Sequence, residues 1–151
     1  MATPPKPEND AGYLASATKI IFMGGLNRQV VENKWDGFLR AFSGFDLERV
    51  AEMSPLDVER LASDDSVIRY KAKLQAVVDN AGEMRQIAAE HGSFARWLDE
   101  LFQAQGPEGT AKELARRFAY ISEGGARHWL YATGYDVGDV GEKARRKYGA
   151  A

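Results

Sequence analysis

The chain has 151 residues, a length that suits one domain with a hydrophobic core that needs no disulfide or metal to hold it. Hydrophobic residues make up 44% and charged residues 28%, and the formal net charge is −2, so any nucleic acid would have to meet a local basic patch. Cysteine is absent. Disulfides, thiolate metal sites and cysteine nucleophiles are therefore excluded, which suits a reducing cytoplasm.

The remaining composition argues against metal sites and membranes. His91 and His128 are the only histidines, so a metal site would need carboxylates to complete it, and we expect no metal and no cofactor. No stretch approaches the roughly 18 apolar residues of a membrane span. The first ten residues lack the apolar core of a secretory signal. Three prolines in their first seven positions predict a flexible, extended tail over residues 1–10, ahead of one helical domain over residues 11–151.

The first half of the chain shows apolar residues at helical spacing, interrupted by recognisable capping residues. Asp10 is a candidate N-cap for the first helix, and Asn27 for the second. Ser54-Pro55-Leu56-Asp57 places serine at the N-cap, proline at the first helical position and an acid at the third, which is typical of a helix start. The predicted helices of this half cover residues 13–23, 27–42, 46–53 and 54–62.

The second half continues in the same way. A long helix is predicted from Lys71 to Gly92, and Ser93 caps the next one. A loop over Gln103–Gly109 should precede a helix over 110–118, and a last helix over 125–133 should precede a basic tail. No run alternates with period two, so we predict an all-α fold of about seven helices. The predicted core includes Leu61, Leu74, Val77, Val78, Trp97, Leu101 and Leu130.

Several segments carry a resemblance when they are taken in chain order. Phe22–Asn27 is similar to the turn Q-A-G-L-S/N-W of a known family, and Phe38–Asp46 is similar to that family's F-R-x-A-F-x-x-F-D. Further matches lie at Asp57–Leu61, Ile68–Ala76 and Asn80-Ala81, and more weakly over Leu114–Gly134. Together they resemble the DNA 3-methyladenine glycosylase I family, which belongs to the helix-hairpin-helix DNA glycosylases.

The resemblance implies an all-α, helix-hairpin-helix glycosylase-like domain with a role in base excision repair. Its members are hydrolases that flip a damaged base out of double-stranded DNA and cut its glycosidic bond. The expected partner is therefore double-stranded DNA with an alkylated base of the 3-methyladenine type. We expect a monomer in the cytoplasm, and a short, divergent relative that lacks the family's zinc-binding Cys and His.

The segment from Ser66 to Lys73 is the candidate DNA-phosphate site. A tight connector followed by a helix that begins at Lys71 would present backbone N–H groups to an anion. Arg69, Lys71 and Lys73 add positive charge there. The family usually has glycine where this chain has Ser66, and Asp64-Asp65 adds negative charge. The alternative is an ordinary helical corner with solvated charges.

Two positions of the expected base pocket depart from the family. Alignment through Gly24-Gly25-Leu26 puts Ile20 where the family has its pocket glutamate, and Arg28 where it has a tryptophan. Aromatic residues elsewhere are candidate substitutes, although aromatics at helical spacing are more often core residues. The predicted base-pocket residues are Tyr13, Ile20, Phe22, Arg28, Trp35 and Trp129.

No catalytic residue is assigned by a motif. Asp136 and Asp139 follow the last apolar helix, near where the wider superfamily carries a catalytic aspartate, and Glu32 lies one turn from Asp36. These acids are candidates only, and surface carboxylates are the simpler interpretation. His128 sits on an apolar helix and is more typical of a satisfied buried histidine.

Three hypotheses on function follow. The first is a glycosylase confined to cationic bases such as 3-methyladenine, which are already good leaving groups. The second is a catalytically inactive helix-hairpin-helix DNA-binding module, and the third is a helical interaction protein without a nucleic-acid role. Salt-dependent DNA binding separates the third from the others. Base release separates the first from the second.

Overall fold

The computed structural model describes residues 4–150, and every regular element in this part of the chain is a helix, as predicted. Nine α-helices and one 3-10 helix are present there, somewhat more than the seven or eight helices that the sequence pattern predicts. Their bounds are α1 Asp10–Met23, α2 Arg28–Asn33, α3 Trp35–Ala41, η1 Ser43–Phe45, α4 Leu47–Ala51, α5 Pro55–Leu61, α6 Lys71–His91, α7 Phe94–Arg117, α8 Glu123–Ala132 and α9 Glu142–Tyr148.

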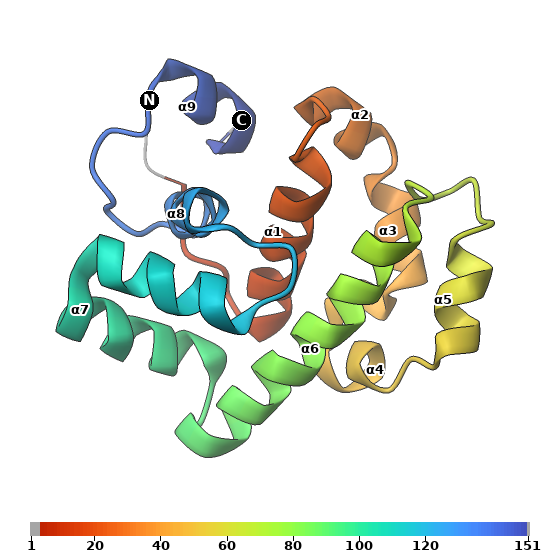
Figure 1. Cartoon of the computed structure of the whole chain (residues 1–151), viewed down its shortest axis with the longest axis horizontal. Coiled ribbons are helices and arrows are strands. Elements are labelled where there is room, and N and C mark those ends of the chain that lie inside the picture. The colour runs from red at the N-terminus through yellow and green to blue at the C-terminus, as the bar shows by residue number, and fades with distance from the viewer. Residues whose placement is uncertain (1–3, 151) are drawn as a thin grey trace.

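Helix α6 runs through the middle of the molecule and contacts α1, α4, α5 and α7 (Figure 1). Helices α7 and α8 lie on one side of it, and α3, α4 and α5 on the other (Figure 1). Six of the seven predicted core residues are buried, while Leu101 is half-buried and packs against the core. Among the described residues, no helix combines the length and apolar character that crossing a membrane requires.

The capping signals were predicted correctly at three helices. The side chains of Asn27, Ser54 and Ser93 each accept a hydrogen bond from a backbone N–H in the first turn of α2, α5 and α7. At α5 the Asp57 carboxylate also accepts from the backbone N–H of Ser54, at 2.8 Å, which completes a capping box.

Asp10 was predicted to cap α1, and this was wrong. Asn9 is the N-cap, because its side-chain oxygen accepts from the N–H of Gly12 at 3.1 Å. The Asp10 carboxylate instead accepts from the N–H groups of Phe94 and Ala95, at 2.9 and 3.2 Å. It therefore satisfies two of the free donors at the start of α7, more than 80 residues away.

Two predicted boundaries also differ. The predicted helix over 27–42 is two helices, because Lys34 (φ −100°, ψ −1°) ends α2 with its N–H bonded to the carbonyl of Val31. The predicted loop over 103–109 is helical except at Gly106, whose φ of 70° and ψ of −176° break α7 into two arms. Glycine tolerates this positive φ, and the chain reverses direction there (Figure 1).

Buried Asn80 explains one of the matched segments. Its side-chain oxygen accepts from the N–H of Ala119 at 2.7 Å, and its amide donates to the carbonyl of the same residue at 3.2 Å. Asn80 thereby ties α6 to the loop between α7 and α8. A buried amide that meets both backbone groups of one residue holds that loop in a single position.

The two ends of the described chain lie close together (Figure 1). The predicted basic tail forms α9, with Lys147 in its last turn. In the predicted tail over residues 1–10, Pro4 is buried and Lys6 pairs with Asp99 at 3.1 Å. Residues 1–3 of that tail lie outside the described residues. Residues near both ends of the described chain, such as Pro4 and Lys147, line one cavity.

Candidate functional site

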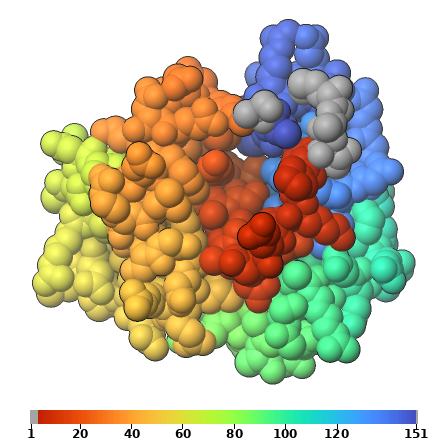
Figure 2. Space-filling view, turned by 180° about the vertical axis from the view of Figure 1, so that it is seen from behind, coloured from red at the N-terminus to blue at the C-terminus, as the bar shows by residue number. Residues whose placement is uncertain are grey.

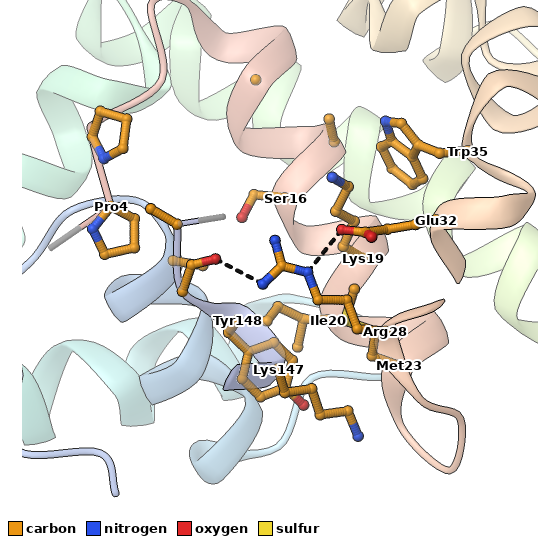
Figure 3. Close-up of a pocket in the computed structure, with 16 residues that line it drawn as sticks. Pro4, Ser16, Lys19, Ile20, Met23, Arg28, Glu32, Trp35, Lys147 and Tyr148 are labelled. Atoms are coloured by element: carbon orange, nitrogen blue, oxygen red, sulfur yellow. Dashed lines mark hydrogen bonds and ion pairs between the residues drawn. The ribbon is translucent and has the colours of Figure 1, made fainter. Parts of the chain in front are cut away.

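A cavity of about 300 Å³ lies where α1, α2 and α9 meet. Figure 2 shows the hollow between these segments on the back of the molecule. One stripe of α1, at positions 12, 15, 16, 19, 20 and 23, faces the cavity, while the residues between them enter the core. The lining includes Pro4, Ser16, Lys19, Ile20, Met23, Arg28, Glu32, Trp35, Lys147 and Tyr148 (Figure 3).

Three of the six predicted base-pocket residues line this cavity: Ile20, Arg28 and Trp35. Glu32, one of the candidate acids, lines it too. Ile20 is 6% exposed and presents a hydrocarbon side chain that can neither accept a hydrogen bond nor balance a positive charge. The cavity therefore has an apolar wall at the aligned glutamate position.

Arg28 joins two walls of the cavity that come from distant parts of the chain. Its Nε donates to Oε1 of Glu32 at 2.7 Å, and its Nη1 donates to the carbonyl of Gly149 at 2.9 Å (Figure 3). The same Nη1 donates to the carbonyl of Arg146 at 3.1 Å. These charge-assisted hydrogen bonds tie α2 to the end of α9. Arginine at this position acts as a clamp on the cavity wall, a role that no local sequence signal indicated.

Lys19 was missed by the sequence analysis, although a signal was present. It is the only charged residue between positions 11 and 27, on a helix that is otherwise uncharged there. Its Nζ lies 4.6 Å from the centroid of the Trp35 ring, a cation–π contact inside the cavity (Figure 3). Burial lowers the pKa of this amine; the nearby charge of Glu32 opposes that effect and Arg28 adds to it.

Trp35 forms the aromatic wall and is held by neighbours. Its ring stacks with those of Phe38 and Phe45, at centroid distances of 5.6 and 5.2 Å. The stack positions the indole at the start of α3 while leaving part of it in the cavity lining. An indole held in this way offers a flat surface for a planar ligand.

The other three predicted pocket aromatics, Tyr13, Phe22 and Trp129, do not line the cavity. All are buried to 1% exposure or less. The Trp129 indole N–H donates to the carbonyl of Tyr13 at 3.2 Å, and the Phe22 ring packs edge-on against that of Phe38 at 4.8 Å. Their positions on the core side of α1 and α8 account for this, and packing is their evident role.

Asp136 and Asp139 do not line the cavity either. Asp136 accepts from the N–H of Gly138 at 3.0 Å, and Asp139 accepts from that of Gly141 at 2.9 Å and pairs with Arg145 at 2.5 Å. The Gly141 hydrogen bond, then the Arg145 charge, lowers the pKa of Asp139. Both acids thus brace the loop before α9, while Asp36 is exposed and lies outside the cavity lining.

His128 was predicted to be a buried histidine, and in the structure it is half-buried. Its ring stacks on that of Tyr148, at a centroid distance of 4.8 Å, so it supports a residue of the cavity wall. Burial lowers its pKa, and the charges of Arg127 and Lys147 add to the effect. Within residues 4–150, no three His, Asp or Glu side chains are grouped so that they could hold a metal ion.

The predicted phosphate site lies in the hairpin between α5 and α6. The Asp64 carboxylate accepts from the N–H of Ser66 at 2.8 Å, and this bond lowers the pKa of Asp64. Lys34 Nζ donates to the carbonyl of Asp65 at 2.5 Å. Gly37 of α3 lies so close that an added Cβ would be 1.7 Å from the Ser66 carbonyl oxygen. Helix α3 therefore holds the hairpin in place.

The three predicted phosphate-binding cations all have partners. Arg69 pairs with Asp65 at 3.3 Å, and Lys71 pairs with Glu59. Lys73 Nζ donates to the carbonyl of Gly24 at 3.0 Å. Exposed ion pairs contribute only about 0–1 kcal/mol, so a phosphate can compete for Arg69 and Lys71. The first turn of α6 has no side-chain cap, which leaves its N–H groups available to an anion.

A model of the methyladenine glycosylase family matches residues 18–123, a span that includes α1 from Thr18 onward, Lys19, Arg28, Trp35 and the whole hairpin. The chain belongs to this family. Among curated proteins, this chain is 37% identical over 79 residues to a DNA-3-methyladenine glycosylase of Haemophilus influenzae. It is 40% identical over 57 residues to DNA-3-methyladenine glycosylase 1 of Escherichia coli.

These matches are partial. The match to the Haemophilus influenzae protein covers 50% of this chain and 42% of that protein. The match to the Escherichia coli protein covers 38% of this chain and 30% of that protein, so the chain spans less than half the length of each relative. Solved structures are similar over more of the chain. A mutant of 3-methyladenine DNA glycosylase I from Staphylococcus aureus has a TM-score of 0.80 at 21% identity, covering 89% of this chain and 82% of that one.

A second structure, a variant of 3-methyladenine DNA glycosylase I in complex with 3-methyladenine, has a TM-score of 0.78 at 21% identity. The similarity covers 97% of this chain and 88% of the chain in that structure. At this level of identity the likeness establishes the fold. The all-helical fold predicted from the sequence is thereby confirmed as that of the methyladenine glycosylases.

Proposed function

We propose that the chain is a DNA-repair glycosylase-like protein that removes alkylated bases of the 3-methyladenine type from double-stranded DNA. The observation that carries this proposal is the cavity formed by α1, α2 and α9 on the methyladenine glycosylase fold, with Trp35 and Glu32 in its lining. Its volume is at the lower end of small-molecule pockets, which run to about 300–1,000 Å³. One flipped base is an occupant of suitable size and shape.

The chemistry asked of this cavity is modest. 3-Methyladenine is cationic in DNA and leaves readily, so recognition of the base supplies much of the catalysis. Trp35 offers a stacking surface, and Glu32 is the one carboxylate that lines the cavity within the described residues. Glu32 is already paired with Arg28, and Ile20 supplies no charge, so we expect slow release that is confined to labile, cationic bases.

The hairpin between α5 and α6 is the proposed contact with the DNA backbone. Arg69 and Lys71 are exposed, and the uncapped start of α6 presents backbone N–H groups between them and Lys73. Phosphate contacts of this kind would position the duplex without reading its sequence. We propose that the protein works in this way as a monomer in the cytoplasm.

The decisive experiment is a release assay on alkylated duplex DNA, with the free bases identified by chromatography and mass spectrometry. Ile20→Glu should raise the rate of 3-methyladenine release by about ten- to a hundredfold, because a charge-assisted hydrogen bond to a base is worth roughly 1.5–3 kcal/mol. Ile20→Gln is the matched control, since it adds an acceptor without the charge. Thermal unfolding should be followed for both variants, because a buried carboxylate costs stability.

Rapid release of hypoxanthine by the unmodified chain would contradict the proposal, because a neutral base has no leaving-group advantage. A second candidate function, a DNA-binding module without catalysis, is favoured by one observation: Lys19, Arg28 and Lys147 place three basic side chains in the cavity where a cationic base would bind. That candidate predicts salt-dependent duplex binding with no base released from any alkylated substrate. Failure to bind duplex DNA at all would favour a helical interaction protein.

A further inference from the structure

Lys19 and Lys147 are the two lysines of the cavity lining, and the proposed base excision gives neither a role; Lys19 is the one beside Trp35 and the aligned position Ile20. Helix α1 carries it, one position before Ile20 and facing the cavity beside Trp35 (Figure 3). Within residues 4–150 its amine makes no hydrogen bond and no ion pair, and it has a cation–π contact with the Trp35 ring. A half-buried lysine without a counterion is unusual, because desolvation of its charge is not repaid by an ion pair.

Lys73, on α6, is a second partly buried lysine whose amine can be compared with that of Lys19. Burial lowers the pKa of Lys73 as it does that of Lys19, but Lys73 Nζ donates to the carbonyl of Gly24 at 3.0 Å and lies above the Tyr70 ring, so this amine has an acceptor. Glu32, the carboxylate nearest to Lys19 in the cavity lining, is instead paired with Arg28. The amine of Lys19 is therefore held in a cavity by a rigid helix and left without an acceptor.

The surroundings of the amine act on its charge in both directions, because burial disfavours the ammonium form while the Trp35 ring attracts it. Burial lowers the pKa of Lys19. The charged groups that face it act in both directions: Glu32 raises its pKa and Arg28 lowers it, while Lys147 of α9 lines the same cavity. Lysines desolvated in this way form imines with carbonyl compounds. The ligand class that such a cavity would capture is therefore an aldehyde.

We propose that Lys19 is a nucleophile that forms an imine with the ring-opened deoxyribose of an abasic site. This inference rests on the proposed function, since base excision leaves deoxyribose whose open form carries an aldehyde at C1′. The amine nitrogen adds to C1′ and gives a carbinolamine. One amine proton moves to the former aldehyde oxygen, which becomes the hydroxyl of the neutral carbinolamine. The C–O bond then breaks, the hydroxyl leaves with the remaining amine proton as one water, and a C=N bond joins Lys19 to the sugar. No oxidant, reductant or metal is needed.

The test uses the full chain and a duplex that already contains one abasic site, so that base release is not required. Borohydride is added to reduce any imine to a stable secondary amine. The covalent complex is then seen on a denaturing gel, and the modified lysine is located by mass spectrometry. We expect a complex with the unmodified chain, modified at Lys19. Lys19→Arg keeps the charge but has no nucleophilic amine of this kind, and it should lose the complex.

Lys112→Arg is the matched control, because Lys112 pairs with Glu108 on α7 and does not line the cavity. It should trap as the unmodified chain does. Lys19→Met, with thermal unfolding measured beside it, distinguishes loss of the amine from loss of the fold. No complex with the unmodified chain, or a complex modified at Lys147 or another lysine, would overturn the assignment. Trapping at Lys19 without base release would overturn the proposed function alone, and release without trapping would overturn this inference alone.

Discussion

The hairpin and the cavity are built in opposite ways. The hairpin, α5 to α6 with its connector, is made by residues close in sequence: Ser54 caps the first helix, Asp64 caps the turn, and Asp65 pairs with Arg69. The cavity is assembled from α1, α2 and α9, and the bonds from Arg28 to its far wall span 118 and 121 positions. Local signals therefore describe how the hairpin is made, although α3 also holds it through Gly37 and Lys34, whereas only the folded chain defines the cavity.

The charges differ in the same way. Each cation of the hairpin has a nearby partner, so the region is an electrically balanced corner that a phosphate must compete for. In the cavity, Arg28 is engaged by Glu32 and by backbone carbonyls, whereas among residues 4–150 Lys19 contacts only an aromatic ring. Positive charge is thus conspicuous in the hairpin sequence, yet a lysine that has no ion pair within these residues lies in the apolar helix.

The largest loss of stability is expected from a substitution at the contact between α3 and the hairpin. Gly37→Ala would put a methyl group 1.7 Å from the Ser66 carbonyl oxygen, so α3 and the hairpin must separate. We expect a loss of about 3 kcal/mol in the free energy of unfolding, at the upper end of overpacking costs. Urea denaturation measures it. Such a loss would show that a distant contact, as well as local sequence, holds the hairpin.

Gly82→Ala is the control for that variant, because nothing lies within 4 Å of the added methyl group on α6. It should stabilise the fold by about 0.5–1 kcal/mol, since alanine favours a helix over glycine. Equal behaviour of the two variants would mean that α3 does not press on the hairpin.

An intermediate effect is expected at the cavity. Arg28→Ala removes the hydrogen bonds to the carbonyls of Arg146 and Gly149, and we expect a loss of about 2 kcal/mol, within the usual range for bonds to charged groups. Hydrogen exchange should increase first in α9. Glu32→Gln weakens only the ion pair and should cost about 1 kcal/mol or less. Unchanged exchange in α9 would refute the clamp.

The smallest effect on stability belongs to the hairpin cations. Replacing Lys71 and Lys73 with glutamate should cost about 1 kcal/mol or less, because surface pairs contribute little. Duplex binding should weaken, and the slope of log K against log salt should fall by about 1 for each lost phosphate contact. Lys112→Glu is the control for charge elsewhere on the surface. Binding that does not change would make the hairpin a plain helical corner.

Sequence reasoning reached the helical fold and most of the helix starts, because capping residues act over three or four positions. It failed where a side chain serves a distant element: Asp10 caps α7, and Arg28 binds the end of α9. It placed Ile20 by resemblance and proposed Trp35 as a substitute aromatic, and both line the cavity, but Tyr13 and Trp129 lie on the core side of their helices. Lys19 could have been found, because one charge in an apolar helix needs an explanation.

The Arg28 clamp also bears on the order in which the molecule forms. Contacts between residues far apart in sequence require a long loop to close, and such contacts form slowly. During synthesis α1 and α2 emerge more than a hundred residues before Arg146 and Gly149. We therefore expect the cavity to close late in folding. Until α9 is made, the Arg28 side chain has no α9 carbonyls to bind, so the cavity is an open cleft at a stage when both helices of the hairpin already exist.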